Sequence, residues 1–212
     1  MKKILPEHEF SSGQLNIIAD LAARTGLCEE TVKILCGRGI DDESKISRFL
    51  HPSKKHFVPP LKMSGMKEAV ELITRARDEG WQVVVYGDYD ADGICASTIM
   101  RGVLSDFGID PVVYVPERTS GYGLGTEAID SIFEEYFPQL FITVDCGISN
   151  AEEVEYIKEQ GAEVIVTDHH ELPQTLPDCI CVNPKIVDDY PYDNLCGAGV
   201  AFKVGCALIG EG

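Results

Sequence analysis

The chain has no long apolar run. No stretch of its 212 residues approaches the roughly 20 consecutive apolar residues that span a bilayer. The opening letters, MKKILPEHEF, reach Pro6 and Glu7 before a signal-like apolar segment can build. We therefore predict a protein with no membrane association that works in the cytoplasm.

Basic residues are also scarce. Lysine and arginine number 18 against 35 aspartates and glutamates, which gives a net charge of -17. Nucleic-acid affinity is built largely from Lys and Arg contacts to phosphate, so this composition argues against nonspecific attraction to a polyanion. It leaves a phosphate substrate open, because bound divalent cations return positive charge to the place where they bind.

A Cys-x-x-Cys pair is absent too. The eight cysteines stand at positions 28, 36, 95, 146, 179, 181, 196 and 206, several of them inside apolar runs. This pattern is typical of buried reduced thiols rather than of disulfides or a cysteine-bound zinc.

Two regions with different periodicity are present. Residues 1–80 have helical spacing in four segments that end at Gly or Pro, and the loop at 51–60, HPSKKHFVPP, has the strongest break signals. We predict a helical N-terminal region at 1–80 and a second domain at 81–212. No chemistry is apparent in the first region.

From Trp81 onward, short apolar runs alternate with amphipathic helical segments, a pattern typical of a parallel sheet with crossover helices. The fold class is therefore predicted as α/β, with a parallel five-stranded sheet and flanking helices. The predicted strands are 82–86, 111–115, 140–144, 163–167 and 178–182.

Three of these strands end in acidic residues. The segments VVVYGDYDAD, FITVDCG and VIVTDHH contribute Asp90 and Asp92, Asp145, and the tripeptide at 168–170. The carboxyl ends of parallel strands form one edge of an open sheet, so these side chains can meet there. Two carboxylates ~4 Å apart repel by about 4 kcal/mol at an effective dielectric near 20, and a divalent cation would offset this at all three ends. Without a bound cation, each of the three strand ends needs its own explanation, such as a helix cap at Asp92 or a solvated loop histidine.

Two other interpretations of the acidic stretch are weaker. Asp-x-Asp-x-Asp-Gly begins like a calcium-binding EF-hand loop, but the twelfth position is Ile99 and the preceding segment is a predicted strand. An aspartyl-phosphate phosphotransferase would use Asp88 or Asp90 as its nucleophile, but it also needs a Lys, where the third strand end offers two imidazoles. Water attack on phosphorus, assisted by two cations about 3.5 to 4 Å apart, fits better. Mixed Asp and His ligands favour Mn²⁺ or Mg²⁺.

The motifs resemble those of the DHH phosphoesterase superfamily. Asp168-His169-His170 follows a strand, with GDYDADG and VDCGIS upstream, and RTSGYGL, VNPK and GAGVAFK are similar to its RecJ branch. The resemblance implies a 5′ to 3′ exonuclease on single-stranded DNA that needs Mn²⁺ or Mg²⁺ and serves recombination and repair.

The resemblance also implies roles for particular residues. Its metal ligands would be Asp90, Asp92, Asp145 and His169, with Asp88 as a further candidate. His170 would act near the scissile phosphate, and Asp168 would fix an imidazole by a hydrogen bond. Contacts to phosphate are expected from Arg118, Gly197 and Gly199.

The chain departs from the family pattern in two places. Tyr86 stands where many members have a His, and the chain reaches Gly212 before the further metal-binding Asp that the family places beyond GAGVAFK. We therefore expect an N-terminal fragment, inactive or weak alone, of a protein with a two-metal site. Other substrates remain open, namely short oligoribonucleotides, cyclic dinucleotides or pyrophosphate, as does a non-catalytic role as a replication scaffold.

Overall fold

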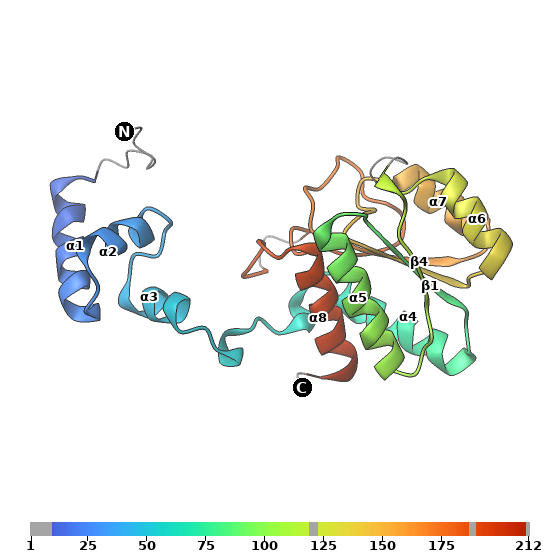
Figure 1. Cartoon of the computed structure of the whole chain (residues 1–212), viewed down its shortest axis with the longest axis horizontal. Helices are drawn as coiled ribbons and strands as arrows, with labels where there is room; N and C mark the ends of the chain where they lie inside the picture. Colours follow the sequence, from blue (N-terminus) through green and yellow to red (C-terminus); the bar gives the residue numbers. More distant parts are fainter. Residues whose placement is uncertain (1–9, 119–122, 187–189, 211–212) are drawn as a thin grey trace. The chain divides into compact units, whose positions relative to one another are not determined.

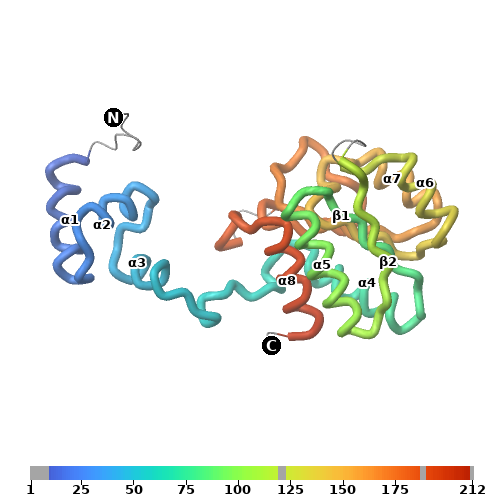
Figure 2. Tube along the Cα trace, viewed as in Figure 1, coloured from blue at the N-terminus to red at the C-terminus, as the bar shows by residue number. Residues whose placement is uncertain are grey.

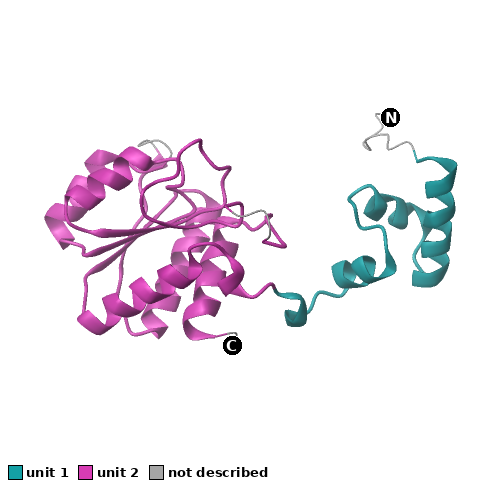
Figure 3. Cartoon of the chain, turned by 180° about the vertical axis from the view of Figure 1, so that it is seen from behind, with its two compact units in different colours: residues 1–57 teal, residues 58–212 magenta. Residues whose placement is uncertain are grey.

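The computed structural model describes residues 10–118, 123–186 and 190–210. The chain divides into two compact units, Met1–Phe57 and Val58–Gly212, coloured separately in Figure 3. The predicted helical N-terminal region and the predicted α/β domain are both present. Each unit has its own apolar core, so each is described by itself.

The first unit is a small helical assembly. It contains α1 (Ser12–Thr25), α2 (Glu29–Cys36), α3 (Glu43–Leu50) and the short 3-10 turn η1 (Lys54–His56). Helix α1 begins with a capping box, in which Ser11 and Gln14 each accept from the other's backbone N–H. The fully buried apolar side chains that hold the helices together are few: Ile18, Leu21, Ala22, Val32, Leu35 and Ile46.

The second unit is built around a five-stranded sheet, as predicted. Its strands are β1 (Val83–Gly87), β2 (Val112–Tyr114), β3 (Leu140–Val144), β4 (Glu163–Thr167) and β5 (Ile180–Val182). They lie in the order β2-β1-β3-β4-β5, and every neighbouring pair is parallel. The predicted ranges 140–144 and 163–167 match β3 and β4 residue for residue, whereas β2 and β5 are shorter than predicted.

Helices cover both faces of the sheet (Figure 1). On one face are α4 (Met66–Glu79), α5 (Ala91–Asp106) and α8 (Gly197–Ile209), and on the other are α6 (Thr126–Tyr136) and α7 (Ala151–Glu159). Alternate strand residues serve the two cores: Val83 and Val85 pack with the first set, and Val84 and Tyr86 pack with the second. Helices α5 and α8 run side by side, green and red in Figure 2. Among the described residues, no helix is both long and apolar enough to cross a bilayer.

Helix α4 corrects the expected domain boundary. The predicted boundary at residue 80 assigns α4 to the helical region. In the structure α4 belongs to the second unit, because Met66, Ala69 and Ile73 are buried in the core beneath the sheet. The division falls after Phe57, within the loop at 51–60 that has the strongest break signals.

The strand order places a switch point at the centre of the sheet. After β1 the chain crosses through α5 to β2 on one side, and it then returns to β3 on the other side. Where the winding direction reverses in this way, the adjacent strand ends leave a crevice for a ligand. The acidic segments after β1 and β3 begin at this position.

Candidate metal centre

The turn from β1 into α5 is tight and places two carboxylates. Asp88 follows the strand directly and is only 2% exposed. Asp90 is the N-cap of α5: its Oδ1 accepts from the N–H groups of Asp92 at 2.9 Å and Gly93 at 3.0 Å. A Cβ on Gly93 would lie 2.4 Å from the Asp88 carbonyl oxygen, so only glycine permits this close turn.

Asp92 contacts a different helix. Its Oδ2 accepts from the N–H of Gly197 at 2.8 Å, and its Oδ1 accepts from the N–H of Ala198 at 2.9 Å. Asp92 thus docks the start of α8, where helix N–H groups and the helix dipole favour an anion. Burial acts to raise its pKa, but these backbone donors outweigh burial and hold the pKa below its ordinary value. The alternative that Asp92 caps its own helix is wrong, because Asp90 does so.

Asp145, at the end of β3, lies at the centre of the site. It is 2% exposed and has a φ of 62°, a left-handed conformation that Asp tolerates better than most residues. Its Oδ1 is 3.1 Å from Nε2 of His169. Burial, followed by the charges of Asp92 and Asp90, raises its pKa to about 7. Without a counter-charge this carboxyl group is therefore protonated over much of the acidic range.

Both carboxylate oxygens of Asp168 are hydrogen-bonded to neighbouring groups of the protein. Its Oδ2 accepts from the N–H of Ile148 at 3.0 Å, and its Oδ1 accepts from the N–H groups of His169 at 2.6 Å and His170 at 3.1 Å. The same Oδ1 is 2.7 Å from Nδ1 of His170. Because a carboxylate only accepts hydrogen bonds, Nδ1 of His170 must carry a proton. Asp168 therefore shapes the loop and orients His170.

His169 is held neutral beside these carboxylates. Its pKa is lowered, first by burial and then by the neighbouring His170, whose ring centroid is 4.4 Å away. Its Nε2 lies 3.1 Å from Asp145 and 3.7 Å from Oδ2 of Asp92. A neutral imidazole is the form that binds a metal.

Two groups of side chains have the spacing of metal ligands. One consists of Asp145, His169 and His170, the other of Asp88, Asp90 and Asp145, and the ligand atoms within each lie within 4.8 Å of one another. Asp145 belongs to both. Oδ1 of Asp88 is buried and has no hydrogen-bond partner among the described residues, and burial raises the pKa of this carboxyl. A divalent cation would supply both the missing partner and the missing charge, so the residues fit a metal centre.

Tyr86 does not face this centre. It is buried in the core under α6 and α7, where its ring stacks on Tyr114 and Phe141 and its hydroxyl donates to the Gly123 carbonyl at 3.2 Å. The position therefore contributes no ligand where the resemblance would place a His. The cluster contains Asp88 instead.

The three residues expected to contact phosphate lie in different surroundings. The Arg118 guanidinium lies 5.5 Å from the ring centroid of Tyr89, between Asp88 and Asp90 in sequence. The N–H of Gly197 already donates to Asp92, and a Cβ at Gly199 would meet Leu195. These two glycines thus have packing roles in the structure. Residues 119–122 of RTSGYGL lie outside the described residues.

One supporting residue had no predicted role. Asn183 is fully buried; its Nδ2 donates to the His170 carbonyl at 3.1 Å, and its Oδ1 accepts from the N–H of Lys185 at 2.9 Å. It thereby ties the segment after β5 to the histidine loop. The VNPK motif marked this position, but spacing along the chain gives no indication of its partner.

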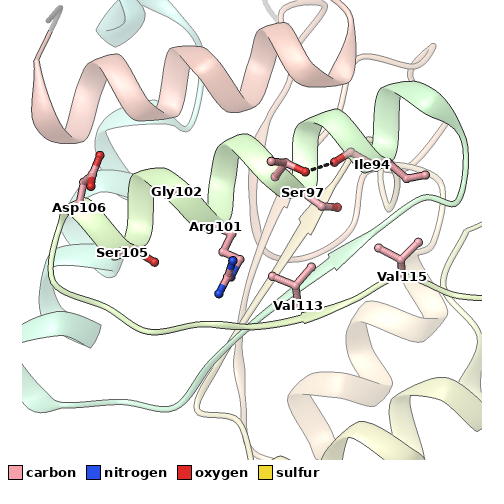
Figure 4. A pocket seen from close by; sticks show the side chains of 9 residues that line it. Ile94, Ser97, Arg101, Gly102, Ser105, Asp106, Val113 and Val115 are labelled. Carbon is pink, nitrogen blue, oxygen red and sulfur yellow. Dashed lines mark hydrogen bonds between the residues drawn. The ribbon is translucent and has the colours of Figure 1, made fainter.

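A groove of ≈ 490 Å³ runs between α5 and the edge strand β2 (Figure 4). Ile94 and Val115 line it toward one end and Asp106 toward the other, with Arg101 and Val113 between them. Its lining is aliphatic, hydroxylic and charged, and no aromatic residue is among the described residues that form it. The groove therefore offers no surface on which bases could stack.

Comparison with known proteins adds independent information. Residues 82–210 match the model of the DHH family, N-terminal domain. The chain is 41% identical over 181 residues to the single-stranded-DNA-specific exonuclease RecJ of Bacillus subtilis (strain 168), a match covering 84% of this chain and 23% of that protein. It thus spans about a quarter of that relative's length.

Solved structures of RecJ proteins are similar in fold as well as in sequence. RecJ from Thermus thermophilus in complex with Mn²⁺ aligns with a TM-score of 0.73 at 32% identity, over 92% of this chain and 27% of that one. A manganese-bound exonuclease RecJ aligns with a TM-score of 0.66 at 38% identity, over 72% and 39%.

Proposed function

The chain belongs to the DHH family, and from that membership we propose that its protein hydrolyses phosphodiester bonds in single-stranded DNA, 5′ to 3′, with Mn²⁺ or Mg²⁺. One observation carries the proposal: acidic and imidazole side chains from three separate strand ends lie together at the switch point of the sheet. The RecJ relatives, named as exonucleases specific for single-stranded DNA, support this substrate. We assign its role to DNA recombination and repair in the cytoplasm.

We assign the metal ligands from the two groups. Asp88, Asp90 and Asp145 would hold one ion, and Asp145 would share a second with His169, while His170 stays free to act near the scissile phosphate. Asp92 stays a candidate, because each carboxylate oxygen can accept more than the one backbone hydrogen bond found here. When bound, divalent ions offset the carboxylate charge, lower the pKa of water and hold phosphoryl oxygens in line.

The protein's own groups then position the reaction. Asp168 holds Nδ1 of His170, so proton exchange with the substrate would use Nε2 of that ring. Asp92 fixes the start of α8 close to Asp145. Arg118, above Tyr89, is suited to contact a phosphate while the ring stacks on a base.

A second candidate substrate is a short oligonucleotide or a cyclic dinucleotide. The groove beside α5 has no aromatic lining among the described residues, which favours it, because stacking contributes about 1 to 3 kcal/mol per base on a long strand. Competition between a long single strand and a dinucleotide distinguishes the two. A scaffold without catalysis is disfavoured, because the candidate ligands are in place.

The test is nucleotide release together with metal binding. With Mn²⁺, protein extended past residue 212 should release mononucleotides from end-labelled single-stranded DNA, and Asp145→Ala should abolish this. Mn²⁺ titration by calorimetry reports on the site itself, even in a chain with weak activity. Asp106→Ala, an exposed carboxylate at the other end of α5, is the matched control. Unchanged binding and activity in Asp145→Ala would contradict the assignment.

A further inference from the structure

Two thiols lie next to each other at the start of β5. The Sγ atoms of Cys179 and Cys181 are 3.8 Å apart, close enough for one thiol to hydrogen-bond to the other. Side chains two positions apart in extended chain project from the same face, so Cys-x-Cys brings both sulfurs to the core under α6 and α7. A search for Cys-x-x-Cys pairs does not detect this arrangement.

The backbone holds both residues in place through one carbonyl. The oxygen of Pro177 accepts the N–H of Cys179 at 2.9 Å and lies 3.8 Å from Sγ of Cys181. Two residues of extended chain span about 6.7 Å, the upper end of the Cα separations that a disulfide accepts, and the bend at Cys179 shortens this span. The sulfurs need to approach by roughly 2 Å to reach bonding distance.

The two thiols differ in access and in acidity. Cys179 is partly exposed at the edge of the sheet, whereas Cys181 is 8% exposed. The hydrogen bond from Cys179 lowers the pKa of Cys181 against the opposing effect of burial, and the same bond raises the pKa of Cys179. One sulfur is therefore reachable from solvent, and the other lies directly behind it.

We propose that Cys179 and Cys181 form a reactive dithiol site that low-molecular-weight disulfides convert to an intramolecular disulfide. In the first step, the solvent-accessible Cys179 loses its proton, its thiolate attacks one sulfur of the disulfide RSSR, and RS⁻ leaves. Sγ of Cys181 then attacks Sγ of Cys179 and expels the second RS⁻. The protein dithiol loses two electrons and two protons, and RSSR is reduced to two RSH.

Other cysteines of the chain provide internal controls. Cys28, Cys95 and Cys196 are exposed and can take the first step with the same reagent. Sγ of Cys28 shares a hydrogen bond with the Thr31 hydroxyl, which cannot attack a mixed disulfide. Such positions should retain the RS group, whereas the dithiol should lose it.

The experiment treats the folded 212-residue chain with glutathione disulfide, blocks remaining thiols with N-ethylmaleimide, and maps peptides by mass spectrometry. The peptide containing 179–181 should be about 2 Da lighter than its reduced form, carry neither reagent, and regain that mass with dithiothreitol. The Cys28 peptide should carry glutathione. A 179–181 peptide with two maleimides, or with one glutathione and one maleimide, would overturn the proposal.

Variants separate the dithiol from general reactivity. Cys179→Ser changes the partly exposed member, so the core is kept, and the loss of about 2 Da should disappear. Cys36→Ser, at another partly exposed cysteine, should leave the loss intact. Phenylarsine oxide gives a second readout, because it condenses with two adjacent thiols and releases water. Wild type should retain the arsenical when excess monothiol is added, whereas Cys179→Ser should release it. Release by both proteins would contradict the proposal.

Discussion

The exposed ion pairs of the helical unit contrast with the buried carboxylates at the switch point of the sheet unit. In the helical unit the ion pairs lie in solvent, as Arg24 does with Asp20 and Glu43 and Lys45 with Asp41. At the switch point of the sheet unit, Asp88, Asp145 and Asp168 are buried, and the groups near them are imidazole rings and backbone N–H donors. Exposed pairs contribute little and need no further explanation, whereas buried carboxylates cost free energy unless something compensates them. The difference therefore identifies the unit that works on a ligand.

The largest expected effect comes from removing the shared carboxylate. Asp145→Asn keeps the shape of the side chain and tolerates the left-handed backbone, but it loses the charge common to both ligand groups. We expect Mn²⁺ affinity to fall by ~100-fold or more, measured by calorimetry. In the helical unit, Asp41→Asn should leave the affinity unchanged. Equal Mn²⁺ affinities for wild type, Asp145→Asn and Asp41→Asn would contradict the contrast between the two units.

Gly197→Ala tests how closely α8 approaches the site. The added Cβ would lie 2.2 Å from Oδ1 of Asp145, so helix or carboxylate must move. We expect Mn²⁺ affinity to fall by about tenfold and the free energy of unfolding to drop by about 2 kcal/mol, measured by urea denaturation. Gly199→Ala is the matched control: its Cβ would lie 3.3 Å from the Leu195 side chain, which can adjust. A pair of variants with the same Mn²⁺ affinity would show that the contact with Asp145 is unimportant.

Asp92, which binds the start of α8, should contribute more to stability than Asp42, the exposed N-cap of α3. Asp92→Ala leaves two N–H groups of α8 without their charged acceptor, and we expect a loss of about 3 kcal/mol in the free energy of unfolding. Asp42→Ala removes the exposed N-cap of α3, where one bond to the N–H of Lys45 is lost, and should cost about 1 kcal/mol. Thermal melts of the two variants measure the difference. The reverse order would mean that Asp92 is not what docks α8.

The metal-free protein should also show a pH dependence of its stability. The pKa of Asp145 is about 7 in the folded chain against 3.8 ordinarily, so the folded state keeps a proton that the unfolded state releases. Stability should therefore fall as the pH rises from about 4 to about 7 and level off above that range. Mn²⁺ should stabilise the protein more at pH 8 than at pH 5, and Asp145→Asn should flatten both trends. Stability that rises with pH across this window in wild type, but not in the variant, would contradict the sign.

Local pattern was sufficient to predict much of the fold. Short apolar runs that alternate with amphipathic helical segments predicted all five strands, because strands of a parallel sheet covered on both faces are short and apolar. The ends of β2 and β5 were less predictable, since both are edge strands with pairing on one side only. Helix α4 was assigned to the first region because its amphipathic pattern shows that one face is buried but not which core buries it.

The sequence by itself determined that acidic and imidazole groups end three strands of a parallel sheet, and that these strand ends share one edge. Only the tertiary structure decided how each group is used: that Asp90 caps α5, that Asp92 binds α8 more than 100 residues away, and that Asp168 serves His170. It also decided that Cys179 and Cys181 meet. The physical reason is that strand direction follows from local residue pattern, whereas a hydrogen-bond partner depends on which distant backbone packing brings within about 3 Å.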